Sequence, residues 1–158
     1  MDSGNFRSMR VYLDNCCYNR PYDDQTQLLV SLEAQSKLYI QQMIREDKIE
    51  LATSFILTHE NNMNPHAERK NTISEFVEKY SVIHVSSKNK EKIESDAEAI
   101  MKAGVKLADA CHVAAAIVAK CDYFLTTDKR LLKYKTDKIN ITDPLNFLRM
   151  IGDGNNGK

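Results

Sequence analysis

Short apolar runs alternate along the chain with longer stretches whose apolar residues follow a helical period. The runs are RVYL at residues 10–13, IELAT at 49–53, SVIHV at 81–85, YFLTT at 123–127 and INIT at 139–142. Each has the length and the β-branched or aromatic content that is typical of a buried strand. Strands that are separated by helices form βαβ units, in which the strands are parallel and helices cover both faces of the sheet. The sequence therefore predicts an α/β fold.

The helices are expected between these runs. A long helix should follow the polar loop after the first run, with Asp23 or Asp24 as its N-terminal cap. The apolar side of this helix would consist of Leu28, Leu29, Leu32, Leu38, Met43 and Ile44. Further helices are expected over about residues 54–60, 64–77, 87–103 and 107–120, around residues 131–132, and from residue 143 onward.

The chain has 158 residues, a length that suits one domain. We expect this domain over residues 9–151, a disordered segment at 1–8 and a flexible tail at 152–158. No apolar run approaches the ~18 residues that span a bilayer, and the first residues lack the apolar stretch of a secretory signal. These features predict no membrane partner and a cytoplasmic location. The four cysteines show no CxxC spacing, which argues against zinc, and are expected to pack as small hydrophobic residues.

Two acidic residues come directly after predicted strands. Asp14 follows the first run and Asp128 follows the fourth. Ligand sites of open parallel sheets lie beyond the carboxyl ends of the strands, so these two side chains would share one crevice if the first and fourth strands are neighbours. Glu60 falls on the helix that leaves the second strand, and Asp109 falls in the first turn of the helix that leads to the fourth. The sequence thus offers four carboxylates for one edge of the sheet.

Each carboxylate also has a structural interpretation. Asp14 or Asp128 could cap a helix, Asp109 could complement a helix N-terminus, and Glu60 could be solvated. Four acids that converge on one edge differ from a single cap, because their mutual repulsion requires a compensating cation. Carboxylate oxygens favour Mg²⁺ or Mn²⁺, and such ions with open coordination positions support phosphoryl or phosphodiester transfer.

Four sequence blocks resemble the PIN-domain nuclease family, and in particular its VapC-like endoribonucleases. They are YLDN at residues 12–15, TSFILTHE at 53–60, LADACHVAAA at 107–116 and DYFLTTD at 122–128. The resemblance covers nearly all of residues 10–151. It implies a three-layer α/β/α sandwich whose five-stranded parallel sheet has the order 3-2-1-4-5. It also implies hydrolysis of phosphodiester bonds in single-stranded RNA by metal-activated water.

The resemblance assigns catalytic and metal-binding roles to the four acids. Asp14, Asp109 and Asp128 would hold Mg²⁺ or Mn²⁺, and Glu60 would complete the acidic ring. Glu60 or Asp128 would also orient or deprotonate the attacking water.

Substrate contacts are expected from residues near these acids. Thr127, or its neighbour Thr126, could hydrogen-bond a metal-bound water or a phosphate, or could simply belong to the strand. Lys129 and Arg130 open a stretch from 129 to 138 that holds five basic residues and one acid, which is either a phosphate-binding segment or a solvated face. In the loop after the first strand, Arg20 could contact phosphate, and Tyr18 or Tyr22 could stack on a base.

The partners and the biological role stay open at this point. Residues 15–25 depart from the short apolar segment of the toxin members of the family, so the chain is either the toxin of a pair, with an antitoxin protein as partner, or a nuclease without one. A homodimer is also expected. The alternative function is a catalytically inactive PIN-like module that binds RNA or protein.

Two other α/β classes fit less well. A phosphoacceptor receiver domain would have paired acids at the end of the first strand, where Leu13 precedes Asp14. A haloacid-dehalogenase-like phosphatase would have an acid at the position of Cys16. The sequence shows neither pattern.

Overall fold

The computed structural model describes residues 9–156. Residues 1–8, which we expected to be disordered, and residues 157–158 of the expected tail lie outside the described residues. The last helix continues to Asn156, beyond the domain end that we expected at residue 151. Among the described helices, none combines the length and the apolar character that crossing a membrane requires.

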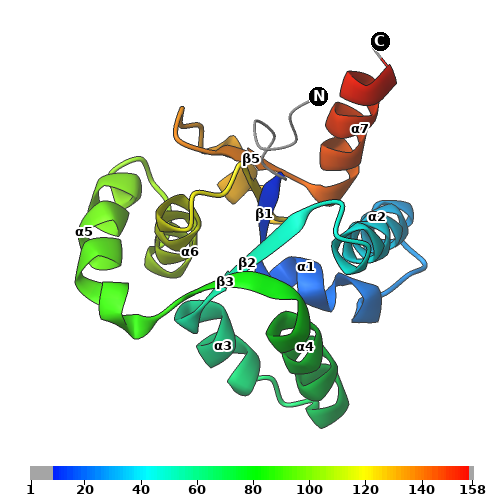
Figure 1. Cartoon of the computed structure of the whole chain (residues 1–158), viewed down its shortest axis with the longest axis horizontal. Helices are drawn as coiled ribbons and strands as arrows, with labels where there is room; N and C mark the ends of the chain where they lie inside the picture. The colour runs from blue at the N-terminus through cyan, green and yellow to red at the C-terminus, as the bar shows by residue number, and fades with distance from the viewer. Residues whose placement is uncertain (1–8, 157–158) are drawn as a thin grey trace.

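In the described chain, five strands form one parallel sheet (Figure 1). They are β1 (Arg10–Leu13), β2 (Glu50–Ser54), β3 (Ser81–Val85), β4 (Tyr123–Leu125) and β5 (Asn140–Thr142). Their order is β3-β2-β1-β4-β5, and every pairing is parallel. The predicted class and sheet order are therefore confirmed. β1 and β4 lie side by side, with Leu13 opposite Leu125.

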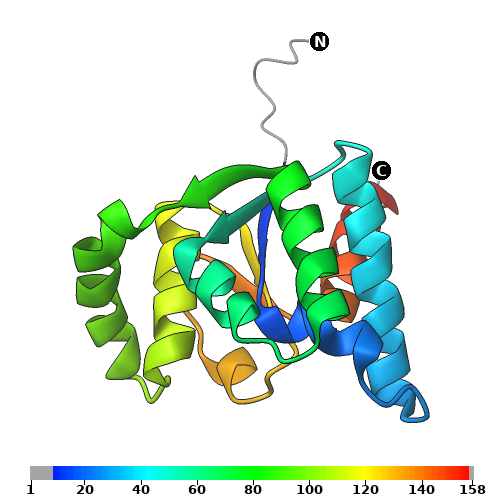
Figure 2. The same cartoon turned by 90° about the horizontal axis from the view of Figure 1, so that it is seen from below.

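Helices connect the strands and cover both faces of the sheet (Figures 1 and 2). The α-helices are α1 (Asn15–Asn19), α2 (Leu28–Arg45), α3 (Phe55–Asn62), α4 (Ala67–Tyr80), α5 (Lys90–Met101), α6 (Leu107–Val118) and α7 (Pro144–Asn156). Short 3-10 turns are η2 (Arg20–Tyr22), η3 (Ser87–Asn89) and η4 (Leu131–Lys133). The architecture is the predicted three-layer α/β/α sandwich.

The alternation of side chains along β1 divides the core into two halves. Val11 and Leu13 belong to one half and Tyr12 to the other, and all three are fully buried. On the Tyr12 side the sheet is covered by α5 and α6, which contribute residues such as Val113. On the Val11 side it is covered by α1, α2, α4 and α7, which contribute residues such as Phe147. Because β1 is central and buried on both faces, the residue that follows it is held firmly in place.

The connection after β1 differs from the expected loop. Residues 15–22 form α1 and η2, and α2 begins at Leu28 with Gln27 as its N-cap residue. The prediction that Asp23 or Asp24 caps this helix was therefore wrong. Asp24 instead accepts hydrogen bonds from the backbone N–H and the hydroxyl of Thr26, because these donors lie two residues away in the turn.

The buried face of α2 contains only part of the predicted set, because Ile44 is buried and Met43 packs against the core while the leucines are exposed. Leu28 and Leu38 are 74% and 50% exposed, and Leu29 and Leu32 are exposed as well. The helix packs instead through a face that includes the polar residues Glu33, Ser36, Lys37 and Gln41 beside Ala34, Ile40 and Ile44. A polar group can occupy such a face when it finds a partner there, as Glu33 does in its ion pair with Arg20.

Candidate active site

Asp14 lies at the junction of β1 and α1 and is 7% exposed. Its backbone N–H donates to the carbonyl of Leu125 at 2.9 Å, which continues the pairing of β1 with β4. Its carboxylate caps α1, because Oδ1 accepts a hydrogen bond from the N–H of Asn15 at 2.8 Å. The other oxygen, Oδ2, accepts from the hydroxyl of Thr126 at 2.9 Å. The structure thus fixes this carboxylate at the carboxyl edge of the sheet.

Thr126 connects Asp14 to Asp128. It follows β4, and its hydroxyl donates to Asp14 while accepting from the N–H of Asp128 at 3.1 Å. The Asp128 carboxylate accepts from the N–H of Arg130 at 2.9 Å and from that of Leu131, so it caps the turn at η4. The acids that follow two neighbouring strands are therefore linked through one hydroxyl group.

Asp109 approaches this edge from the first turn of α6. It lines a small hollow of about 70 Å³ together with Asp128. Partial burial raises the pKa of the Asp109 carboxyl, and the negative charges of Asp14, Asp128 and Glu60 raise it further, while His112 opposes them. The four predicted acids consequently lie near enough to one another to interact electrostatically.

Glu60 of α3 is held by His112 of α6. The imidazole Nε2 lies 2.9 Å from the carboxylate Oε1, and the His112 side chain is nearly buried, whereas that of Glu60 is 30% exposed. Burial lowers the pKa of His112, but the short contact with Glu60 and the charges of Asp14, Glu60 and Asp109 outweigh burial and raise it above its usual value. This contact joins α3 to α6.

A buried chain of hydrogen bonds continues from His112 into the core. Its Nδ1 lies 2.7 Å from the hydroxyl of Tyr12, which lies 2.6 Å from Oγ of Ser54. Ser54 Oγ already accepts from the N–H of Leu57, as the N-cap of α3. Ser54 can therefore donate to Tyr12 and Tyr12 to Nδ1 of a neutral imidazole, whose Nε2–H then faces the Glu60 carboxylate at short distance without the alignment of a hydrogen bond. A doubly protonated ring would reverse the Tyr12 bond and leave the Ser54 proton without an acceptor, so the neutral form fits better despite the raised pKa.

The donor chemistry of this edge fits a divalent cation, although the side chains are not arranged as a finished metal site. Within residues 9–156, no three His, Cys, Asp or Glu side chains form a group that could hold a metal ion as they stand. Asp14 is engaged by Thr126, and Glu60 is engaged by His112. Each carboxylate nevertheless keeps free lone pairs. The repulsion that raises the pKa of Asp109 is what a cation among them would relieve.

Two of the predicted substrate contacts lie at this edge. Lys129 and Arg130 are exposed and directly follow Asp128. Arg130 also lines the hollow that contains Asp109 and Asp128. Their position agrees with contact to a phosphate backbone that approaches the acids.

Two further predicted contacts, Arg20 and Thr127, are placed differently. The guanidinium of Arg20 forms ion pairs with Glu33 at 3.1 Å and with Asp23 at 3.0 Å. Thr127 is buried, and Thr126 is the threonine whose hydroxyl bonds to an acid. Arg20 therefore acts in the packing of η2 against α2.

Sequence reasoning overlooked His112, Tyr12 and Ser54. One feature of the sequence could have indicated His112, because this residue follows Asp109 by three positions and so shares its helix face. No local pattern links His112 to Tyr12, because these residues are 100 positions apart and meet only in the folded sheet.

The sheet order, the helices on both faces and the arrangement of its layers define a PIN-like α/β/α sandwich. The chain is similar to a chain in the crystal structure of VapBC2 from Rickettsia felis bound to a DNA fragment from their promoter. The similarity has a TM-score of 0.54 and covers 85% of this chain and 98% of that chain. At 12% sequence identity it shows the fold alone. No family model matches the sequence, and no curated protein matches it significantly.

Proposed function

We propose that this protein is a metal-dependent endoribonuclease that hydrolyses phosphodiester bonds of single-stranded RNA. The observation that carries the proposal is the meeting of acids from separate parts of the chain: Thr126 links Asp14 to Asp128 by hydrogen bonds, and Asp128 lines one hollow with Asp109. The raised pKa of Asp109, to which burial and the charges of Asp14, Asp128 and Glu60 contribute, agrees with this arrangement. A carboxyl whose pKa is shifted by burial and by specific neighbouring charges is a candidate for a functional site. The PIN-like fold supports the same function.

Mg²⁺ or Mn²⁺ would be held by Asp14, Glu60, Asp109 and Asp128, whose hard oxygen atoms suit these ions. The bound ion would supply a Lewis acid that activates water and the phosphodiester. The residues of the chain prepare this chemistry. His112 holds one oxygen of Glu60, and the remaining oxygen, or the Asp128 carboxylate, would orient or deprotonate the water.

RNA is the proposed substrate, and Lys129 and Arg130 are the proposed phosphate contacts. The similar solved chain belongs to VapBC2 bound to a DNA fragment from their promoter, and on that likeness we propose an antitoxin protein as a partner. A second copy of the chain and a cytoplasmic location complete the proposal.

The test is cleavage of a fluorescently labelled single-stranded RNA in Mn²⁺, with EDTA as the metal-free condition. Asp109→Asn and Asp14→Asn should each abolish most cleavage, because asparagine keeps the shape and loses the charge. Asp96→Asn on α5 is the matched control, because Asp96 pairs with Lys92 at 3.1 Å, and it should cleave as the wild type does. Mn²⁺ at a hundredfold excess over Kd should also stabilise the wild type by about 2.7 kcal/mol.

The nuclease proposal fails if folded wild-type protein cleaves no RNA in Mn²⁺ and its melting temperature is unchanged by the ion. That result would favour the inactive PIN-like module. Wild-type cleavage by either folded Asp→Asn variant would remove that residue from the mechanism.

A further inference from the structure

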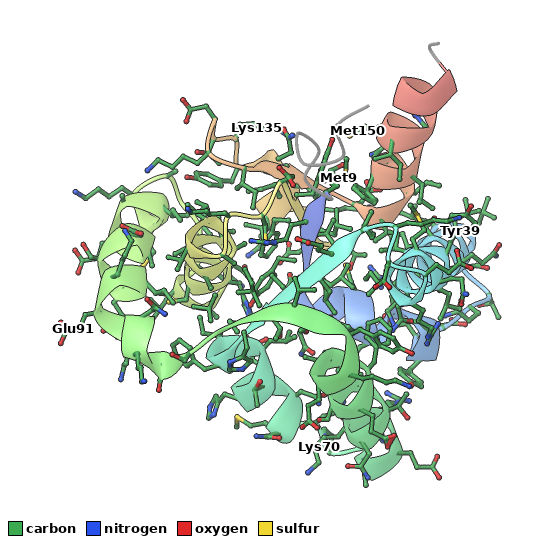
Figure 3. The ribbon with its side chains drawn as sticks, viewed as in Figure 1. Met9, Tyr39, Lys70, Glu91, Lys135 and Met150 are labelled. Atoms are coloured by element: carbon green, nitrogen blue, oxygen red, sulfur yellow. The ribbon has the colours of Figure 1, made fainter. Side chains whose placement is uncertain are left out.

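A groove lies between α2 and α4, with α1 and η2 at one end of it. The two helices stand side by side in Figure 2, and Tyr39 and Lys70 label them in Figure 3. The groove has a volume of about 440 Å³, which lies within the usual range of small-ligand sites. None of the four acids of the candidate active site lines it.

Lys37 places a buried cation in this groove. The residue is 4% exposed, and its ammonium lies 5.3 Å from the centre of the Tyr18 ring. The ion pairs of the described residues do not include Lys37. An aromatic face attracts the charge but offers no lone pair to the three N–H donors of an ammonium. Burial lowers the pKa of Lys37 to about 8, which reflects the cost of a charge held away from water without an anion.

Tyr18 adds an unsatisfied donor to the groove. The residue is fully buried and lines the groove, and its hydroxyl has no hydrogen-bond partner among the described residues. Buried tyrosine hydroxyls usually have a partner. Its ring lies under the Lys37 ammonium, and both side chains line the groove.

The groove is positively charged overall. The Arg45 guanidinium lies 6.0 Å from the centre of the Tyr80 ring, and the Lys79 ammonium lies 5.4 Å from it. With Lys37 these make three cations among the lining residues, against the single carboxylate of Glu75. Because the net charge of the chain is zero, this concentration of cations is local.

Tyr22 offers an aromatic surface at the end of the groove. It belongs to η2, is 39% exposed and lies 4.9 Å from the Arg69 guanidinium. Tyr22 and Thr72 also line an adjacent hollow of about 570 Å³, so the concave surface continues past the ring. Partly exposed tyrosines of this kind stack on nucleic acid bases with little preference for sequence.

We propose that the groove between α2 and α4 binds a nucleotide unit, with its phosphate at Lys37 and Tyr18 and its base against Tyr22. The ligand is either a free nucleotide or one nucleotide of an RNA strand, and the shared chemistry is a phosphate attached to a base. One RNA strand could reach both the groove and the acidic edge, because Tyr18 lies on α1, the short helix that Asp14 caps. The proposal does not depend on nuclease activity.

A structural role for Lys37 predicts something different. A lysine that stabilises the fold would be paired with a carboxylate, and its loss would destabilise the protein. A buried cation without an anion lowers stability, so Lys37→Met, which keeps the length and removes the charge, should raise the melting temperature of the free protein. Gain of stability together with loss of binding is the expected combination for a ligand-binding residue.

Isothermal titration calorimetry in EDTA tests the proposal, because chelation keeps metal ions away from the acidic edge. The probes are the four ribonucleoside monophosphates, inorganic phosphate and a short single-stranded RNA. Lys37→Met should weaken binding of every probe at least about tenfold, as expected for a lost charge-assisted hydrogen bond. Tyr18→Phe should weaken all probes by a smaller factor. Tyr22→Leu should weaken the nucleotides about tenfold and leave phosphate unchanged.

Two variants serve as controls. Lys102→Met removes an exposed lysine at the end of α5, on the other side of the molecule, and should bind every probe as the wild type does. Asp96→Asn, which removes a partly exposed carboxylate of α5, should also bind every probe as the wild type does. If the monophosphates and RNA bind with equal affinity, the ligand is a free nucleotide. If RNA alone binds, the ligand is one nucleotide of an RNA strand.

Failure of all probes to bind the wild type overturns the proposal, even if the protein cleaves RNA. Wild-type affinity in folded Lys37→Met and Tyr18→Phe also overturns it. If Lys37→Met does not fold, Tyr18→Phe decides alone, because it removes only a hydroxyl that has no partner in the described structure.

Discussion

Lys37 is a charged side chain that folding removes from water, and this gives the stability of the free protein a pH dependence. Burial lowers its pKa from 10.5 to about 8, with Cys17 opposing and Arg45 adding to the effect. Between these values the unfolded chain holds the proton and the folded chain does not, so stability rises with pH. Below about pH 8 the cost is fully present, and a difference of this size corresponds to about 3 kcal/mol.

We therefore expect the wild type to gain stability relative to Lys37→Met as the pH rises from 7 to 10. Urea denaturation of both proteins at several pH values measures the difference, which cancels most contributions of other groups. The other titratable or charged groups that line the groove are Tyr18, Tyr22, Arg45, Glu75, Lys79 and Tyr80. Parallel curves for the two proteins would show that Lys37 titrates as it does in the unfolded chain.

At the scale of single residues, the sequence predicted positions better than partners. It placed Asp14 and Asp128 at strand ends because the end of a strand is visible in a local pattern. It left open whether Asp14 caps a helix, and the structure shows that it does so through one oxygen while the other binds Thr126. Neither Thr126 nor His112 received a firm role, because their partners lie far away in the sequence. Thr126 and Asp14 are 112 positions apart, and His112 and Tyr12 are 100 positions apart.

At the scale of elements, the hydrogen bonds from Ser54 through Tyr12 to His112, together with the contact between His112 and Glu60, tie four segments together. These segments are the end of β2, β1, α6 and α3. These contacts therefore fix where the helices that carry Asp109 and Glu60 meet the central strand. The residues that make them are buried except for Glu60, so a missing partner would not be replaced readily by water.

Tyr12→Phe tests this connection. The ring would keep its stacking on Phe124 at 5.3 Å, but Ser54 and Nδ1 of His112 would each lose a partner. We expect a loss of about 1–3 kcal/mol in the free energy of unfolding, measured by urea denaturation. Tyr18→Phe is the matched control, because its buried hydroxyl has no partner in the described residues and should cost almost nothing. Equal stability of the two variants would contradict the chain.

The elements differed in how well their patterns predicted them. The α2 pattern indicated a helix correctly but placed its leucines on the buried side, whereas all four are exposed and only Ile44 of the predicted set is fully buried. The neighbours α7 and η2 decide which face is covered, and their positions depend on the whole fold. The short α1 was missed because a helix of five residues leaves almost no periodic pattern.

At the scale of the whole molecule, the fold class could be predicted because the alternation of strands and helices repeats along the entire chain. The order of the strands came from the resemblance to PIN domains, since a strand pattern carries no information about its neighbours. Both predictions agree with the sheet order. The homodimer and the antitoxin partner remain predictions.

The charge of the whole molecule sets a further requirement on RNA binding. With 22 basic and 22 acidic residues, the chain has no net field that would draw RNA toward it, and the acidic edge itself repels phosphate. Basic residues next to the acids must therefore supply the attraction. Arg130 lines the hollow of Asp109 and Asp128. Burial raises the pKa of the Glu33 carboxyl, and Lys129 is near enough for its positive charge to oppose that rise.

We expect Lys129→Ala/Arg130→Ala to weaken RNA binding and to flatten its dependence on salt. On a single strand, each lost phosphate contact should reduce the log–log slope by roughly 0.7. Turnover of bound RNA should change much less, because the four carboxylates remain. The measurement is a set of fluorescence anisotropy titrations at several salt concentrations, with cleavage followed at saturating protein.

Lys135→Ala/Lys138→Ala is the matched control, because these exposed lysines belong to the same basic stretch but lie farther along the chain from Asp128. A general effect of charge would flatten the slope equally in both double variants, since each removes two positive charges. A specific path for the strand past Lys129 and Arg130 would flatten it only in the first. An unchanged slope in both would mean that the strand enters elsewhere, and the cations of the groove between α2 and α4 would then be the next basic surface along the molecule.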